Sequence, residues 1–533
     1  MKSIVDLNLG FGDAENYKQK ENKELFNEIF VRNKYLDELL MPSKYFLIGE
    51  KGTGKTAYSV YLSNNNYKET IAQIKYLRET DYQKFLTLKR DKQLQLSDYA
   101  GIWKVIILLL LAKSLRKQEL DGVFGKDAKM KSLLSAIDEY YKHAFSPEII
   151  TVLDFIEHDK SAAGVVAKAS QSKIKFTSER SNQIETHENR FQIHLLYIQR
   201  QFEQAFSELK LKENHLLFID GLDIRPGLIP FREYLECVKG LADAIWSLNS
   251  DFFANIKDSK GRFRAVCLIR PDIYNSLALQ NATNKLRDNS VYLDWRTNYN
   301  DYRESQIFLL TDKLLASQQS EKFEFGAVWD HYFPFVFPSN DPNKENDPAF
   351  VEFLRMTYSR PRDIISILQI LQDKIKSESS RNICQFTRSD YMSSYFQNGY
   401  SEYLMSSIKD QLAFYYSEED YELFLHFFSY LKGRIDFTYD EYLKAYGQYA
   451  EYIYNNLRDN MPEFIETADK FLQFIYESNI ICYIEDTDRG PLFRWCYRER
   501  SMSNMNPKVL IQSRYRIHYG LAKALNVGNL KVK

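Results

Sequence analysis

The sequence predicts an α/β protein in which a parallel β-sheet is covered by helices on both faces, an αβα arrangement. Three observations carry this prediction. Five short apolar runs, typical of buried strands, occur between residues 44 and 295 and alternate with segments of helical spacing. One run passes directly into a glycine-rich turn and then into a helical segment. Another run ends in an aspartate, which would place a carboxylate at the edge of the sheet.

Length and composition bound the rest of the architecture. The chain has 533 residues, which at about 150 residues per domain predicts three or four domains. Its 71 Lys and Arg balance 72 Asp and Glu, so a uniformly basic protein is excluded, although local basic patches are not. Apolar residues make up 44% and aromatic residues 15%, enough for several cores, and only 20 Gly and 13 Pro occur. We therefore expect a packed, helix-rich chain without long linkers.

Cysteine usage and hydropathy predict a cytoplasmic protein. The five cysteines lie far apart without a CxxC pair, which argues against a zinc ribbon or a disulfide framework: Cys237, Cys267, Cys384, Cys482 and Cys496. The first residues lack the basic and apolar regions of a signal peptide. The longest apolar run, residues 105–112, is much shorter than the roughly 20 residues that a membrane span needs. We expect this run to form a buried helix and the chain to have no membrane span.

A phosphate-binding loop follows the first apolar run. Residues 44–49 (KYFLIG) are typical of a buried parallel strand, and the run AYSVYLS has the spacing of a helix that begins near Lys55. Between them lies the pattern GxxxxGK[ST], formed by Gly49, Glu50, Lys51, Gly52, Thr53, Gly54, Lys55 and Thr56. Ala57, the first residue of the run AYSVYLS, is included among the predicted phosphate-binding residues. Glycines let backbone N–H groups turn inward around phosphates, Lys55 would neutralise their charge, and the Thr56 hydroxyl would ligate Mg²⁺. The alternative, a glycine-rich hairpin with an unrelated lysine, is disfavoured by the flanking strand and helix.

An acidic partner for this loop is predicted at residues 215–223 (HLLFIDGLD). Four apolar residues precede Asp220, as in a core strand that ends at the carboxyl edge of the sheet. We assign Asp220 to Mg²⁺, through its water shell, and Asp223 to polarising the attacking water. The alternative is an ordinary core strand that ends in an Asp-Gly turn. The other strands of the sheet are predicted at residues 69–76, 263–269 and 290–295, and the second of these ends at Arg270.

Taken together, these motifs resemble an AAA+-type ATPase of the STAND branch, which includes NACHT, KAP and origin-recognition-like ATPases. The segments GEKGTGKT and FIDGLD carry the resemblance, and residues 218–223 are similar to the NACHT form of Walker B. Ile224 stands where many NACHT proteins have a further acid, which favours slow turnover. The strand ending at Arg270 resembles the sensor-1 strand, which would aim this arginine at the γ-phosphate. Its alternative is a surface arginine that caps the strand before Pro271.

A lid helix is expected from the same resemblance, which covers about residues 20–375. Residues 358–363 (YSRPRD) precede the helical run IISILQILQDKI, and Pro361 suits the first helical position, where its missing N–H is not needed. By resemblance, Pro361 would lie near the adenine and Arg360 or Arg362 would act as sensor 2. Ser359 stands where a glycine is common.

The predicted domains are an ATPase core at 1–300, a helical lid at 301–378 and a helical or winged-helix domain at 379–533. Lys55 and Asp220 are 165 positions apart, whereas the connecting path needs only about 60, so about 100 residues are inserted. This insertion, about residues 97–212, has helical spacing near 97–115, 129–158 and 186–210. Residues 162–183 between these helices are polar and basic, with Lys168, Lys173, Lys175 and Arg180. They are interpreted either as a contact to nucleic acid or another subunit, or as a solvated loop.

Charge is divided unevenly in the last third of the chain. Residues 401–490 carry 18 acidic and 7 basic side chains, and residues 491–533 carry 1 acidic and 9 basic ones. A helix followed by strands at 479–484 and 491–498 is the layout of a winged helix, and a basic wing would favour DNA phosphates. Alternatively, the acidic stretch pairs with the basic tail within the chain or between subunits. His518 is expected on an amphipathic C-terminal helix in a structural role.

The resulting hypothesis is an ATP-binding and ATP-hydrolysing molecular switch that uses Mg²⁺. By resemblance, it would form a homo-oligomer and act with a separate effector protein in a bacterial antiphage defence or DNA-associated complex. No nuclease, protease or TIR-like motif occurs in the sequence. Two alternatives stay open: a DNA-binding module in which ATP only locks the conformation, and a scaffold that recruits an effector.

Overall fold

The computed structural model describes residues 1–78, 96–122, 125–144, 185–225, 229–279, 281–339, 344–378, 383–456, 462–488 and 490–528. The chain forms two compact units. Unit 1 contains Met1–Tyr35, Gly49–Ala57 and Tyr292–Lys533, and unit 2 contains Leu36–Ile48 and Tyr58–Val291. The division into a core, a lid and a C-terminal domain stays a prediction.

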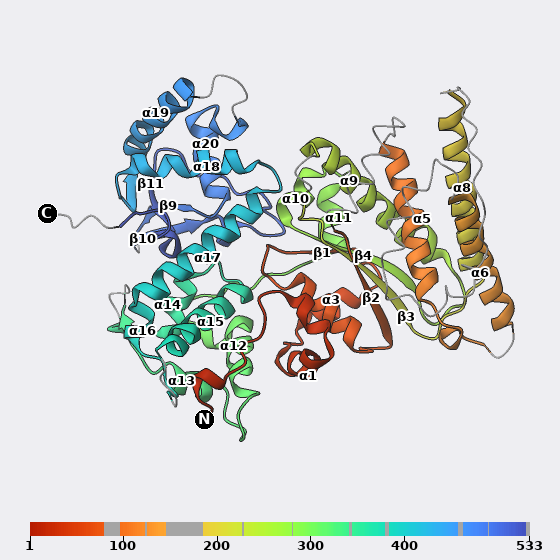
Figure 1. The fold of residues 1–533 in the computed structure, drawn as a ribbon, viewed down its shortest axis with the longest axis horizontal. Coiled ribbons are helices and arrows are strands. Elements are labelled where there is room, and N and C mark those ends of the chain that lie inside the picture. The colour runs from red at the N-terminus through yellow and green to blue at the C-terminus, as the bar shows by residue number, and fades with distance from the viewer. Residues whose placement is uncertain are drawn as a thin grey trace. The chain divides into compact units, whose positions relative to one another are not determined.

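A five-stranded, all-parallel sheet is the centre of the α/β part (Figure 1). Its strands are β1 (Phe46–Ile48), β2 (Thr70–Tyr76), β3 (Asn214–Asp220), β4 (Phe263–Ile269) and β5 (Ser290–Tyr292). All five runs predicted as strands are therefore confirmed. They lie in the order β2-β3-β4-β1-β5, with Ile48 opposite Ile269 and Ile219 opposite Cys267. Every residue of β4 is buried, as its unbroken apolar run predicts for a central parallel strand.

The strand order creates a switch point at the carboxyl ends of β1 and β4. The chain leaves β1 for the far edge strand β2, returns through β3 to β4, and then crosses to β5 on the other side of β1. Because such crossovers are right-handed, the connections that follow the neighbours β1 and β4 depart toward opposite faces of the sheet. In open α/β sheets, ligands bind in the crevice that this divergence leaves outside the carboxyl ends of the strands.

Helices cover the sheet of unit 2, and several belong to the predicted insertion. The described helices here include α2 (Lys34–Leu40) and α3 (Lys55–Asn64), each mostly in unit 2, and α5 (Leu96–Ser114), α6 (Lys126–Ala144), α8 (Glu185–Ser207), α9 (Phe231–Ser247), α10 (Pro271–Ser276) and α11 (Ala282–Asn289). Helix α5 packs against α9 and α8, and α8 packs against α6 (Figure 1). A Cβ on Gly240 would lie 2.5 Å from the Cβ of Tyr99, so this glycine allows α5 and α9 to approach closely. Helices are thus present in the described part of the predicted insertion, whereas the basic stretch 162–183 lies outside the described residues.

Unit 1 begins with a helical layer around α15 (Pro361–Ser377), the predicted lid helix. Pro361 occupies its first turn and Arg360 is its N-cap, as the sequence predicts. The neighbouring helices are α12 (Gln306–Ala316), α13 (Ala327–Tyr332), α14 (Ala349–Met356), α16 (Arg388–Met392) and α17 (Ser394–Leu412), with a hairpin of β6 (Val336–Pro338) and β7 (Asn346–Pro348). Stacked and edge-to-face aromatic rings, centred on Trp329 and Phe350, fill the core of this layer.

The C-terminal part of unit 1 combines helices with a second sheet. The helices are α18 (Glu418–His426), α19 (Tyr439–Asn456), α20 (Ala468–Glu477) and α21 (Cys496–Glu499). The strands β8 (Asp436–Thr438), β9 (Ile481–Thr487), β10 (Gly490–Trp495) and β11 (Arg514–Ile517) lie in the order β10-β9-β11-β8. The predicted helix followed by two antiparallel strands is present as α20, β9 and β10.

One secondary-structure prediction in this part is wrong. His518 does not lie on a C-terminal helix but between β11 and a 3₁₀ turn at Tyr519–Leu521. The alternating run RYRI pairs with both β8 and β9, so cross-strand partners override the helical spacing of the following residues. His518 is fully buried, with its ring 4.6 Å from that of Tyr358 and 4.9 Å from that of Trp495. Its expected structural role is compatible with this aromatic surrounding.

Over the described ranges, we find no helix with the length and apolar character that membrane crossing requires.

Candidate functional site

The glycine-rich loop has the backbone geometry of an anion-binding nest. It follows β1 directly, and helix α3 (Lys55–Asn64) begins within it. Gly52 and Gly54 have φ values of 90° and 91°, in the left-handed region that glycine reaches without strain. Such alternation around Thr53 turns successive N–H groups toward one side, and the first N–H groups of α3 add the positive end of a helix dipole. Residues 49–56 therefore form a site suited to phosphate oxygens.

The loop carbonyls are engaged by donors, which holds the backbone in this conformation. Lys55 donates from Nζ to the carbonyls of Gly49 (2.8 Å) and Glu50 (3.3 Å). Thr53 donates to the Glu50 carbonyl from Oγ1 (2.8 Å) and from its backbone N–H (3.2 Å). Three further bonds hold the next carbonyls: Arg360 Nη1 to Lys51 (2.9 Å), Arg362 N–H to Gly52 (3.3 Å), and Trp295 Nε1 to Thr53 (2.9 Å). The N-terminus of α15 thus supports the loop at two consecutive residues.

Arg360, predicted as a sensor 2, braces the loop backbone. Its Nε and Nη2 donate to the two carboxylate oxygens of Asp363 at 2.9 and 2.8 Å, and its guanidinium lies 4.8 Å from the ring centre of Tyr358. The Asp363 side chain has no exposure, and Tyr403 donates its hydroxyl to it at 2.9 Å. Burial alone would lower the pKa of Arg360, but the Asp363 carboxylate outweighs it and raises this pKa. The roles of Arg360 and Arg362 toward a γ-phosphate, and of Pro361 toward adenine, stay predictions.

Two ion pairs connect the loop with distant parts of unit 1, and sequence reasoning missed both. Glu50 pairs with Arg500, the residue that follows α21. Lys51 pairs with Asp410 of α17 at 2.7 Å. Neither partner has a sequence signal, because both pairs join residues more than 350 positions apart.

The carboxyl edge of the sheet in unit 2 presents the predicted acidic residues. Asp220 is the last residue of β3 and is 8% exposed, and its Oδ1 accepts the N–H of Gly221 at 2.8 Å. Gly221 has a φ of 92°, and a Cβ there would lie 2.3 Å from the carbonyl oxygen of Leu77. The turn after Asp220 therefore requires a glycine at position 221, because a side chain there would collide with the Leu77 carbonyl. Asp223 follows in the same turn.

Arg270 ends β4 at the same edge. It is 1% exposed, so it is not the surface arginine of the alternative interpretation, although it is the N-cap of α10, which begins at Pro271. Its Nε and Nη2 donate to the two carboxylate oxygens of Asp272 at 3.0 and 2.5 Å. This pair holds the guanidinium in a fixed orientation, and its sensor-1 role stays a prediction.

The predicted site residues thus fall into two sets. The loop residues 49–57 and residues 360–362 belong to unit 1, and Asp220, Asp223 and Arg270 belong to unit 2. Within the sheet, β1, β4 and β3 are parallel neighbours, so their carboxyl ends share one edge. Thr56 and Asp220, the residues predicted to hold Mg²⁺, therefore belong to different units, and their role toward a metal stays a prediction. Within the described part of the chain, no group of three or more His, Cys, Asp or Glu is suited to a metal.

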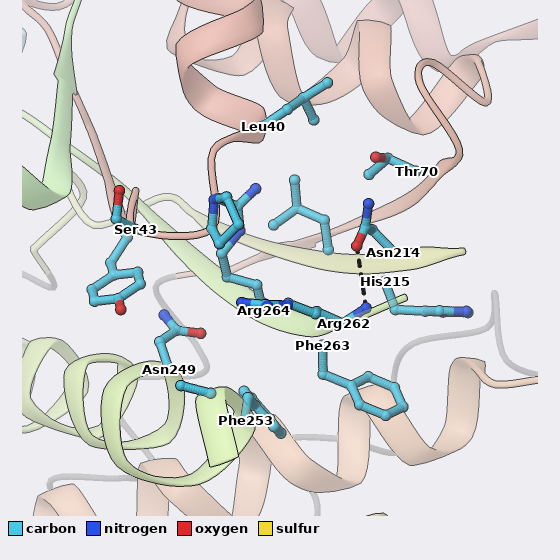
Figure 2. Close-up of a pocket in the computed structure, with 14 residues that line it drawn as sticks. Leu40, Ser43, Thr70, Asn214, His215, Asn249, Phe253, Arg262, Phe263 and Arg264 are labelled. Carbon is cyan, nitrogen blue, oxygen red and sulfur yellow. Dashed lines mark hydrogen bonds between the residues drawn. The ribbon is translucent and has the colours of Figure 1, made fainter. Parts of the chain in front are cut away.

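A cavity of about 250 Å³ lies at the opposite, amino end of the sheet (Figure 2). Three of its polar side chains are already used by the fold. Arg264 donates to the Leu39 carbonyl (2.8 Å) and the Lys44 carbonyl (3.3 Å), and Asn249 exchanges two bonds with the backbone of Ala265. Asn214 accepts the backbone N–H of Arg262 at 3.1 Å, the dashed line in Figure 2. We therefore assign this cavity to the packing of the sheet rather than to a ligand.

Four cations of the basic C-terminal stretch pair with carboxylates of the preceding acidic stretch. Its pairs are Arg494 with Glu485 (2.8 Å), Arg514 with Asp486 (2.5 Å), Arg516 with Asp436 (2.5 Å) and Lys508 with Glu477 (3.9 Å). The sequence left two interpretations of this region, DNA contact by a basic wing and pairing of the acidic stretch with the basic tail. The structure contains pairs of the second kind, within one chain. On α20, which would be the reading helix of a winged helix, Lys470 is itself paired with Glu466 and Glu463. The DNA interpretation of this region stays a prediction.

We compared the chain with models of known protein families and with curated proteins. No family model matches it, and no curated protein matches it significantly. Function is therefore inferred from the geometry described above.

Proposed function

We propose that this protein is an ATPase that binds ATP·Mg²⁺ on the loop 49–57 and acts as a nucleotide-dependent molecular switch. The observation that carries the proposal is the loop itself. A glycine-rich nest follows a buried parallel strand at the switch point of the sheet, with its carbonyls engaged and its glycines in the left-handed region. That combination favours an extended, multiply charged anion such as a triphosphate.

Each residue has a separate task in the proposed mechanism. Lys55 would exchange its bonds to the Gly49 and Glu50 carbonyls for phosphate oxygens, which its flexible stem allows. Thr56 and Asp220 would hold Mg²⁺, which neutralises developing phosphate charge when bound. Asp223 would orient the attacking water, and Arg270 would stabilise charge on the γ-phosphate. Ile224 is 45% exposed and supplies no further acid, so slow turnover is expected.

The same loop geometry supports a switching role. Arg360 and Arg362, at the N-terminus of α15, hold two consecutive loop carbonyls. A nucleotide that reshapes the loop would therefore change the free energy of α15 docking, and the coupling would run in both directions. Assembly into a homo-oligomer, a partner effector and a setting in antiphage defence come from the sequence resemblance alone and stay predictions. The DNA-binding alternative is disfavoured by the paired cations of the C-terminal sheet.

Nucleotide titrations of three proteins test the proposal. The wild type should bind a fluorescent ATP analogue with Mg²⁺, Lys55→Ala should lose that binding with an unchanged circular dichroism spectrum, and Asp220→Asn should retain binding but lose phosphate release. A matched control is Lys68→Ala, a surface lysine paired with Asp37 at 2.6 Å. Wild-type protein that binds no nucleotide, or Lys55→Ala that binds as the wild type does, would refute the proposal.

A further inference from the structure

A carboxylate lies within the loop that is proposed to bind a triphosphate. Glu50 is the second residue of the loop, and its side chain is only 16% exposed. A carboxylate in this position opposes the binding of a highly charged anion, because like charges in a partly buried site repel strongly. Arg500 compensates this charge, since its Nη1 donates to Oε1 of Glu50.

Arg500 is held firmly on its own side of this pair. Its side chain is 4% exposed, its backbone N–H donates to the Cys496 carbonyl at 2.8 Å, and its Nη2 lies 3.4 Å from Cys496 Sγ. The guanidinium is therefore fixed to the end of α21 and is not a mobile surface charge. Placing it against Glu50 requires that α21 is docked on the loop.

The segment that follows β5 reinforces this docking. Trp295 donates to the Thr53 carbonyl of the loop at 2.9 Å, and Arg296 donates to the carbonyl of Arg498 in α21. The Arg498 guanidinium lies 4.6 Å from the ring centre of Tyr299. Residues 295–299 thus contact both the loop and α21, so α21 and the loop share a supporting segment.

We propose that Arg500 is a positioning residue that neutralises Glu50 and so allows the loop to accept a triphosphate. Nucleotide affinity then depends on the contact between α21 and the loop. By reciprocity, bound nucleotide stabilises this contact, and with it the position of the C-terminal sheet that carries α21. This inference rests on the proposed function, since it concerns the affinity of the same loop. This role differs from a purely structural one in a testable way. In a structural role, loss of either partner of the Glu50–Arg500 pair has the same effect, whereas here an uncompensated negative charge on Glu50 is what weakens nucleotide binding.

A double-mutant cycle separates the two roles. The probe is a fluorescent ATP analogue with Mg²⁺, and the measured quantity is its Kd. Arg500→Gln should weaken binding by about 10- to 100-fold, because it leaves the carboxylate uncompensated near the phosphates. Glu50→Gln should tighten binding, and the double variant should return to within about threefold of the wild type. If both single variants weaken binding equally, or if Arg500→Gln binds as the wild type does, the proposal is overturned.

Controls keep the result specific to the loop. Arg514→Gln removes another arginine of the same region, paired with Asp486 at 2.5 Å and not with α21, and should leave the Kd unchanged. Thermal unfolding of each variant, measured without nucleotide, should show Arg500→Gln folded at the assay temperature. If Arg500→Gln is unfolded at the assay temperature, the test depends on Glu50→Gln alone. Weaker nucleotide binding by Glu50→Gln than by the wild type would then contradict the proposal. Failure of the wild type to bind any nucleotide would refute the ATPase assignment instead, so the two failures are distinguishable.

Discussion

Arg360→Gln is the substitution whose two effects, on stability and on nucleotide binding, follow most directly from the structure. The Arg360 side chain is 7% exposed and forms a bidentate pair with Asp363, which has no exposure. Removing one partner of such a pair leaves a buried charge and costs about 3–5 kcal/mol of folding free energy. The substitution also removes the bond to the Lys51 carbonyl, a charge-assisted hydrogen bond worth about 1.5–3 kcal/mol. If that bond keeps the loop ready for phosphate, nucleotide affinity falls by about 10- to 100-fold.

A matched control separates the two effects. Arg264 is likewise buried, with 8% exposure, and it donates to the carbonyls of Leu39 (2.8 Å) and Lys44 (3.3 Å) at the amino end of the sheet. Arg264→Gln should therefore lower the free energy of unfolding, because these buried carbonyls lose their donor, without changing the Kd for nucleotide. Urea unfolding and titration with a fluorescent ATP analogue measure the two quantities. Equal nucleotide affinity in both variants and the wild type would refute the view that Arg360 supports the loop.

Three further predictions test other parts of the structure. Burial lowers the pKa of His215 from 6.5 to about 4, so the folded state stays neutral where the unfolded state takes up a proton, and stability is lost as the pH falls from about 6.5 toward 4. Between pH 7 and pH 5 the protonation of His215 in the unfolded state should lower the free energy of unfolding by about 2 kcal/mol. His215→Phe should therefore reduce the pH dependence of the free energy of unfolding, measured with urea over that range. The same pH dependence in the variant and the wild type would contradict this prediction. Gly221→Ala should lower the free energy of unfolding by about 2–4 kcal/mol, because the new Cβ would collide with the carbonyl oxygen of Leu77. A decrease of less than about 1 kcal/mol in urea unfolding would be inconsistent with the tight turn. Fluorescence anisotropy with duplex DNA should show no salt-sensitive binding, whereas binding that the double substitution Arg514→Gln and Arg516→Gln abolishes would restore the winged-helix DNA interpretation.

The sheet could be predicted from the sequence because each strand has a local signal. Unbroken apolar runs marked β1, β3 and β4, and the glycine pattern fixed the turn after β1. Pro361 likewise marked the start of α15. The order of the strands had no such signal, since it depends on the crossovers and not on any one segment. The short strand at β11 was missed because four residues carry too little periodicity to compete with the helical spacing around them.

The candidate site was predictable only in its backbone. GxxxxGK[ST] identifies a loop whose glycines adopt the expected left-handed conformations at Gly52 and Gly54. Arg360, which braces the loop, lies in a predicted motif, but three other side chains that contact the loop come from positions without one: Trp295, Arg500 and Asp410. Their contacts depend on tertiary packing over hundreds of residues. The opposite charges of residues 401–490 and 491–533 did predict that the C-terminal arginines pair with the acidic stretch. The individual partners could not be predicted from the sequence.

A structure with a bound, non-hydrolysable ATP analogue and Mg²⁺ tests the central claim most directly. The account predicts phosphate oxygens against the backbone N–H groups of residues 52–56, with Lys55 Nζ moved from the Gly49 carbonyl to the phosphates. It also predicts the metal ion on the Thr56 hydroxyl, with the Asp220 carboxylate in its water shell. Nucleotide bound elsewhere, for example in the cavity at the amino end of the sheet, with the loop unchanged, would contradict it.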